Sequence, residues 1–142
     1  MPADFRIDEQ RALVYSRGLG NFTYDEFLDH MSRLIADPRF RPEFNQVVDC
    51  RSITAMVFTA EQVKDLAGRS VFSARSRRAF VVSADLPFGL ARMFASYREM
   101  GGAAGIMIFR GMPTALSWLN LPPDYDPFAE IDSNPGGQRT PT

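Results

Sequence analysis

The stretch RRAFVVS, residues 77–83, decides the fold class of this chain. It contains a continuous apolar run between charged and polar residues, which is typical of a strand buried on both faces of a parallel sheet. Two other short segments, NQVVDC (45–50) and IMIF (106–109), have the same apolar centre. The sequence therefore predicts three central strands that are separated along the chain by longer segments.

Helical patterns occupy those longer segments. At the N-terminus, the apolar residues of 5–9 and 12–17 predict a hairpin that adds an antiparallel edge to the sheet. The predicted helices are residues 22–37, residues 60–71, a helix opened by Asp85 and Pro87, and a short helix from Pro113. Strands that alternate with helices indicate an α/β fold with crossover connections. We therefore predict an α/β domain with a mixed, mainly parallel sheet of about five strands and about four helices.

The two best-marked helices begin in the same way. Thr23 is followed three residues later by Glu26, and Thr59 is followed three residues later by Gln62. This spacing is a capping box, in which the threonine oxygen accepts a hydrogen bond from a backbone N–H of the first turn. Both threonines are therefore predicted to be N-caps, and Thr59 is explained structurally by this role alone.

The length of 142 residues is typical of a single domain with one core. Residues 122–142 contain proline and polar residues without strand or helix periodicity. We predict that residues 1–121 form the domain and that residues 122–142 form a polar, proline-rich tail.

Composition excludes several function classes. The formal net charge of −1 argues against a nucleic-acid surface. The longest apolar run, AAGIMIF (103–109), is far too short to cross a bilayer. The first residues also lack the basic and apolar regions of a signal peptide. The expectation is a cytoplasmic protein without a membrane span.

Catalytic and metal-binding patterns are missing from the sequence. His30 and Cys50 are the only histidine and the only cysteine, and no cysteine pair has the spacing of a metal site. A free cysteine at the end of a buried strand usually behaves as a small apolar residue. The glycine-containing stretches match neither a dinucleotide fingerprint nor a phosphate-binding loop. We therefore expect no enzymatic activity, no metal and no cofactor.

Arginines and serines gather just before the central strand, in RSVFSARSRR (69–78). Arg75, Arg77 and Arg78 form a candidate anion site, because guanidinium groups match the geometry of phosphate oxygens. The other interpretation is a solvated loop whose charges keep the following strand from aggregating, and this interpretation is favoured.

The order of elements resembles that of the SpoIIAA-like, or STAS, domains, above all a divergent branch of uncharacterised bacterial proteins. The resemblance covers Phe5 to Leu121. It depends on the element order together with DPRFRPEF leading into VVDCRSI, on RRAFVVS, and on the closing FRGMPTALSWL. It implies the SpoIIAA-like fold and a non-enzymatic regulatory role.

In that family, an aspartate that ends a strand precedes a serine or threonine at the next helix N-terminus. A partner kinase phosphorylates this hydroxyl group and so switches partner binding. Asp49 matches the strand-end acid, and Thr59 matches the phospho-acceptor. The resemblance thus implies a protein partner and a phosphorylation switch, although the stretch MVFTAEQ lacks the acid, serine and glycine of the classical loop.

Two hypotheses about function remain open. The first is a protein-interaction module switched at Thr59. Because such folds often pair, we also expect this module to form a homodimer. The second is a carrier that holds an apolar small molecule or lipid in a phenylalanine-lined pocket, an idea that a structural kinship with the lipid-binding CRAL-TRIO domains supports.

Overall fold

The computed structural model describes residues 3–69, 71–83, 92, 94–96 and 105–128. Its centre is a five-stranded sheet in the order β1-β2-β3-β4-β5. The strands are β1 (Ala3–Asp8), β2 (Leu13–Asn21), β3 (Asn45–Ala55), β4 (Arg78–Val81) and β5 (Ile106–Phe109). β1 pairs with β2 in antiparallel orientation and all other pairs are parallel. The predicted mixed, mainly parallel α/β sheet is therefore confirmed.

β4 is the buried inner strand predicted from the sequence RRAFVVS, residues 77–83. Ala79 and Val81 are fully buried, and Phe80 is buried on the opposite side of the strand. Phe80 is paired with Val48 of β3 and with Ile108 of β5. The apolar run is continuous because helices cover both faces of the sheet, so each side chain of the strand meets a packed layer.

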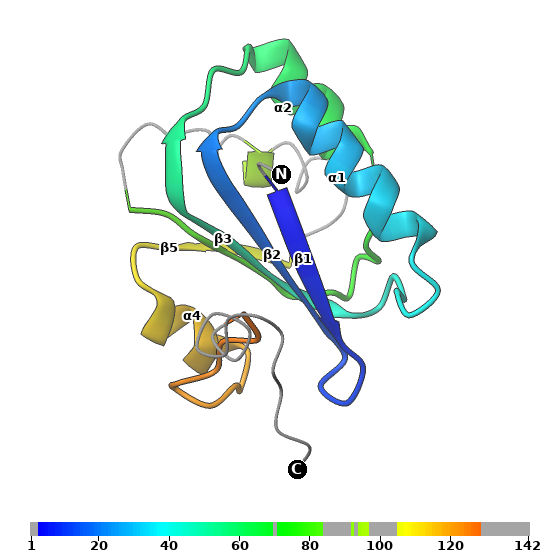
Figure 1. Cartoon of the computed structure of the whole chain (residues 1–142), viewed down its shortest axis with the longest axis vertical. Helices are drawn as coiled ribbons and strands as arrows, with labels where there is room; N and C mark the ends of the chain where they lie inside the picture. Colours follow the sequence, from blue (N-terminus) through cyan, green and yellow to red (C-terminus); the bar gives the residue numbers. More distant parts are fainter. Residues whose placement is uncertain (1–2, 70, 84–91, 93, 97–104, 129–142) are drawn as a thin grey trace, which may run out of the picture.

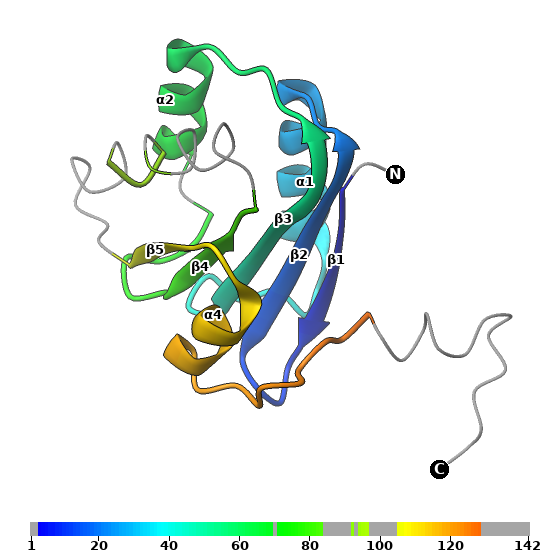
Figure 2. The same cartoon turned by 90° about the vertical axis from the view of Figure 1, so that its left-hand side faces the viewer.

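Helices α1 (Tyr24–Ala36) and α2 (Ala60–Gly68) lie on one face of the sheet, and α4 (Met112–Trp118) lies on the other (Figures 1 and 2). The caps of α1 and α2 are the predicted ones. In both helices the threonine side chain accepts from the backbone N–H three residues on, and the Glu26 or Gln62 side chain accepts from the threonine N–H. The ring centroids of Phe22 and Phe27 lie 5.8 Å apart, as expected for a hydrophobic staple across the start of α1.

Several element boundaries differ from the prediction, most clearly the ends of β2, β3 and α2. β3 continues five residues past Cys50 because β2 also continues to Asn21, and their far ends pair after register shifts. α2 ends at Gly68 and not at residue 71, because Arg69 adopts an extended conformation. A glycine in the last position is consistent with this early end, since glycine is a poor helix former. Most of the predicted third helix lies outside the described residues, but residues 92 and 94–96 are helical.

The C-terminal part of the described chain packs against the sheet. Phe128 is only 2% exposed, and the hydroxyl of Tyr125 donates a 2.9 Å hydrogen bond to Asp8. These residues belong to the same apolar cluster as α4 and Tyr15. The packed structure thus extends past the boundary predicted at residue 121 and includes residues 122–128. Residues 129–142 of the predicted tail lie outside the described residues.

No helix in the described part of the chain combines the length and the apolar composition that crossing a bilayer requires.

Candidate ligand-binding site

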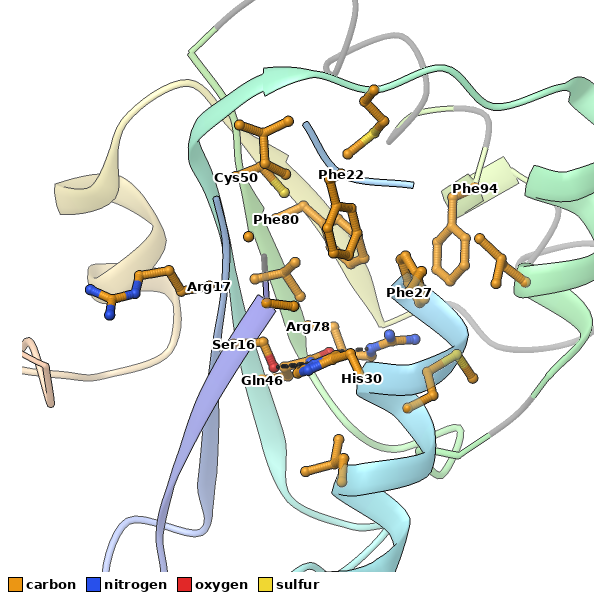
Figure 3. A pocket seen from close by; sticks show the side chains of 18 of the residues that line it. Ser16, Arg17, Phe22, Phe27, His30, Gln46, Cys50, Arg78, Phe80 and Phe94 are labelled. Carbon is orange, nitrogen blue, oxygen red and sulfur yellow. Dashed lines mark hydrogen bonds between the residues drawn. The ribbon is translucent and has the colours of Figure 1, made fainter. Parts of the chain in front are cut away.

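A cavity of about 80 Å³ lies between the sheet and the helices α1 and α2 (Figure 3). Its walls are mostly apolar, and six of the twelve phenylalanines of the chain line it. These are Phe22, Phe27, Phe58, Phe72, Phe80 and Phe94. The part of the chain that the structure describes contributes no aspartate or glutamate to this lining. The cavity therefore suits a ligand whose surface is mainly apolar.

The period of each element explains which side chains line the cavity. Successive side chains of a strand point to opposite faces, so alternate residues of β2, β3 and β4 reach it. On α1, residues three or four positions apart share the inner face. At these positions β2, β3 and β4 contribute Ser16, Gly18, Gln46, Val48, Cys50, Arg78 and Phe80, and α1 contributes Phe27, His30, Met31 and Leu34. Ala3, Arg17 and Ile53 of the strands also line the cavity.

Four of these residues form a polar line along one wall (Figure 3). Arg78 Nε donates to Gln46 Oε1 at 3.0 Å, and Gln46 Nε2 donates to Ser16 Oγ at 2.9 Å. Ser16 Oγ lies 3.0 Å from Nε2 of His30. We refer to Arg78, Gln46, Ser16 and His30 as the polar line. It joins three strands to α1, and Arg17 and Arg69 are further polar residues of the lining.

Burial shifts the pKa values of the histidine and the cysteine that line the cavity. Burial lowers the pKa of His30 to about 4, with a further contribution from Arg33, so the imidazole is neutral at pH 7. Burial raises the pKa of the Cys50 thiol to about 12, so the thiol is protonated. Among the described residues, no group of three histidine, cysteine, aspartate or glutamate side chains could hold a metal ion.

The neutral His30 predicts a pH dependence of stability. Its folded-state pKa of about 4 lies below its usual value of 6.5, so the unfolded chain binds the proton more tightly. Stability from this group is therefore complete above pH 6.5 and is lost as the pH falls toward 4. Between pH 6.5 and 4.5, we expect wild type to lose about 2 kcal/mol more unfolding free energy than His30→Gln. Parallel urea titrations measure this difference, and equal pH profiles would contradict it.

The arginines of the candidate anion site do not converge. Arg77 donates to the Trp118 carbonyl oxygen at 3.1 Å on the α4 side, whereas Arg78 joins the polar line on the cavity side. Arg75 is exposed in the preceding loop. Arg77 immediately precedes β4 and Arg78 is its first residue, so the two side chains lie on opposite sides of the sheet. Within the cavity, the Arg78 guanidinium lies 4.7 Å from the centroid of the Phe72 ring.

Asp49 lies within β3 and not at its end. Its carboxylate accepts a hydrogen bond from the Tyr15 hydroxyl at 3.0 Å and from Arg51 Nε and Nη2, each at 2.9 Å. Burial alone would raise the pKa of Asp49, but the hydrogen bonds from Arg51 and Tyr15 outweigh burial and keep the pKa below its usual value. Tyr15 belongs to the cluster on the α4 face, so Asp49 is directed away from α2 and Thr59.

Thr59 is exposed at the start of α2, and its oxygen accepts from the Gln62 N–H at 3.1 Å. We expect Thr59→Ala to lower the free energy of unfolding by about 1 kcal/mol, because the first turn loses its cap. Thr59→Asn is the matched control, since asparagine caps as well as threonine and should leave stability within about 0.5 kcal/mol. Urea denaturation measures both variants, and an unchanged Thr59→Ala variant would show that the cap contributes little.

Ser16 and Gln46 are cavity residues that were not predicted from the sequence. Each is a polar residue at a buried position of a strand, and Ser16 is 3% exposed while Gln46 is 4% exposed. The sequence signal for such residues is a polar side chain at a position of an apolar strand that faces the core, because a buried polar group needs a hydrogen-bond partner. The partners themselves come from other elements and are visible only in the folded structure.

Comparison with known proteins supports the fold. One similar solved structure is an uncharacterised protein of the DUF3478 family with a SpoIIAA-like fold, from Shewanella loihica PV-4. The match has a TM-score of 0.51 at 17% sequence identity and covers 82% of this chain and 93% of that one. The present chain has a SpoIIAA-like fold. At 17% identity, the match shows the fold alone. It confirms the SpoIIAA-like architecture predicted from the element order, and it assigns no role to the residues of the cavity.

No protein-family model matches the sequence, and a comparison with curated proteins gives no match.

Proposed function

We propose that this SpoIIAA-like chain is a non-enzymatic binding module that holds a small, largely apolar molecule between the sheet and helices α1 and α2. The observation that carries this proposal is the cavity of about 80 Å³ with six phenylalanines in its walls. Interiors of proteins are normally packed with few voids larger than a water molecule. A lined space of this size exceeds such voids and can admit a very small apolar molecule or the apolar part of a larger one.

The chemistry of the lining supports binding without catalysis. The thiol of Cys50 is protonated at pH 7. The Ser16 hydroxyl lies 3.0 Å from Nε2 of His30, but a pKa of about 4 makes this imidazole a weak base for activating it. The polar line offers hydrogen bonds for orienting a ligand, and the apolar walls offer the contact area for holding it.

A titration with benzene, a small apolar probe of buried cavities, tests the proposal. We expect the backbone amide signals of lining residues in two-dimensional ¹H–¹⁵N NMR spectra to shift with a Kd below about 1 mM, the range for small ligands with few heavy atoms. Cys50→Leu places a larger side chain into the same cavity and should weaken binding at least about tenfold. Met107→Leu is the matched control, because Met107 is 45% exposed on β5 and does not line the cavity. Shifts spread over the whole surface, or equal binding by Cys50→Leu, would contradict the proposal.

A second function, protein binding at the corner between β3 and α2, is favoured by one exposed apolar side chain. Val57 is 84% exposed, two residues before the exposed Thr59. A phosphate on Thr59 would lie at the positive end of the α2 dipole and would add about two negative charges beside Val57. Such a change can alter partner binding without unfolding the helix. The homodimer stays a prediction within this second function.

Affinity capture compares wild type with Val57→Ser and Thr59→Glu. We expect a partner retained by wild type to be lost with Val57→Ser and to change in abundance with Thr59→Glu. Ile35→Ser is the matched control, because Ile35 is also exposed, at 56%, but lies on α1. Identical sets of proteins for all four baits would contradict the second function.

A further inference from the structure

Arg78 brings a positive charge into the apolar cavity. Two other arginines also line the cavity, but their charges are engaged elsewhere. Arg69 is exposed and forms an ion pair with Asp65 at 2.9 Å. The guanidinium of Arg17 lies 3.8 Å from the centre of the Phe128 ring, which belongs to the cluster on the α4 face. Because the described lining contains no aspartate or glutamate, an anionic group in the cavity would meet an arginine and no lining carboxylate.

The polar line fixes the position of this charge. Arg78 Nε donates to Gln46 Oε1 at 3.0 Å, and Gln46 is held in turn by its 2.9 Å hydrogen bond to Ser16 Oγ. In Figure 3 the guanidinium lies on the far side of Gln46 from Ser16. His30 is neutral at pH 7, so the charge of the polar line resides on Arg78. A guanidinium that is already oriented loses little side-chain freedom when it binds a partner.

Three phenylalanines of the lining pack around the same guanidinium. Its central carbon lies 4.7 Å from the ring centroid of Phe72, 5.5 Å from that of Phe94 and 5.7 Å from that of Phe80. Such stacking uses the faces of the guanidinium, whereas hydrogen bonds to a carboxylate lie in its plane, so the two are compatible. Arg78 lines the cavity and is only partly buried, so a molecule in the cavity can contact its side chain. Stacking alone is the structural alternative to a ligand.

We infer that Arg78 binds a carboxylate group of the ligand, and that the ligand is a small organic acid whose apolar ring or short chain lies between the sheet and helices α1 and α2. This inference rests on the proposed ligand function and specifies the chemistry of the same cavity. The planar guanidinium matches the two oxygens of a carboxylate with parallel N–H donors. The ion pair offsets the cost of removing the carboxylate from water, and the phenylalanine side chains contact the apolar part.

Benzoate and nitrobenzene form a matched pair of probes. Both carry two oxygens in the plane of a benzene ring, but only benzoate is charged. We expect benzoate at pH 7 to shift the guanidinium ¹H and ¹⁵N signals of Arg78 in wild type, and nitrobenzene to shift them much less. An equal response to both probes would overturn the inference, as would signals that neither probe moves. This measurement needs no variant, so it decides even if a substitution of Arg78 prevents folding.

Substitutions of two adjacent arginines give an independent readout. Arg78→Met removes the charge on the cavity side of the sheet, and Arg77→Met removes the neighbouring charge on the α4 side. In Arg78→Met, we expect the preference for benzoate over nitrobenzene, relative to wild type, to fall roughly ten- to hundredfold, the worth of hydrogen bonds to a charged group. In Arg77→Met, the preference should stay within about threefold of wild type, because Arg77 is exposed and salt screens its charge. An unchanged preference in Arg78→Met would overturn the inference.

The probes also separate this inference from the function on which it rests. If wild type binds neither benzene nor benzoate, the proposed ligand function fails. If benzene binds both wild type and Arg78→Met, and the preference for benzoate is the same in both, only the carboxylate assignment fails. Phenyl phosphate carries about two negative charges, so it is costlier to dehydrate and should bind more weakly than benzoate. Tighter binding of phenyl phosphate would overturn the assignment of a carboxylate.

Discussion

Phe80→Ala should lower the free energy of unfolding by about 3–5 kcal/mol, the usual cost of emptying a buried aromatic site. Phe80 is 5% exposed in β4, between β3 and β5. Its ring packs against Phe94 at a centroid distance of 5.5 Å, and the guanidinium of Arg78 lies 5.7 Å from its centre. Removal of the ring therefore weakens the sheet, the helical layer and the packing of the polar line together.

Urea denaturation of Phe80→Ala and Met107→Ala provides the comparison. Met107 lies on the neighbouring strand β5 and is 45% exposed, so its truncation should cost less than about 1 kcal/mol. A loss below about 1 kcal/mol for Phe80→Ala would contradict the assignment of β4 as the packed centre of the fold.

Phe128→Ala should lower the free energy of unfolding by about 3 kcal/mol, because its ring is buried between the sheet and two arginines. The guanidinium of Arg17 lies 3.8 Å and that of Arg6 4.5 Å from the centre of the ring. The Tyr15 ring packs edge-on against Phe128 at a centroid distance of 5.5 Å. Both arginines come from the N-terminal hairpin, so Phe128 attaches the end of the described chain to its beginning.

Asp124→Ala is the matched control for Phe128→Ala. Asp124 lies in the same segment but is exposed, and its replacement should change stability by less than about 0.5 kcal/mol. Unfolding curves of the Phe128→Ala variant that coincide with those of wild type would show that residues 122–128 add nothing to the stability of the domain.

The parts of the fold that the sequence predicts well are those determined by local signals. The capping boxes at Thr23 and Thr59 mark both helix starts, and the apolar run of residues 79–82 marks the central strand. The packing of residues 122–128 depends on contacts such as Tyr125 with Asp8, which are 117 positions apart. Composition alone gave no sign of such contacts, because an isolated phenylalanine in a proline-rich stretch has no periodicity.

The candidate site was less predictable because its residues come together only through the sheet. Ser16 and Gln46 are 30 positions apart and meet through the parallel register of β2 and β3. The alternation of strand side chains also sends Arg77 and Arg78 to opposite faces, which the run of arginines conceals in the sequence. The family resemblance implies that Asp49 is a strand-end acid, but its partners Tyr15 and Arg51 place it on the face opposite α2.

The claim that the sheet and the helices α1 and α2 enclose a ligand-accessible apolar cavity is tested most directly by crystallography under xenon pressure. Xenon enters apolar cavities and is located by its anomalous scattering. We predict a xenon site between Cys50, Phe80 and Val63 in wild-type crystals, with greatly reduced occupancy in Cys50→Leu crystals. Wild-type crystals without xenon between the sheet and α1 and α2, with side chains filling this space, would contradict the proposed binding function.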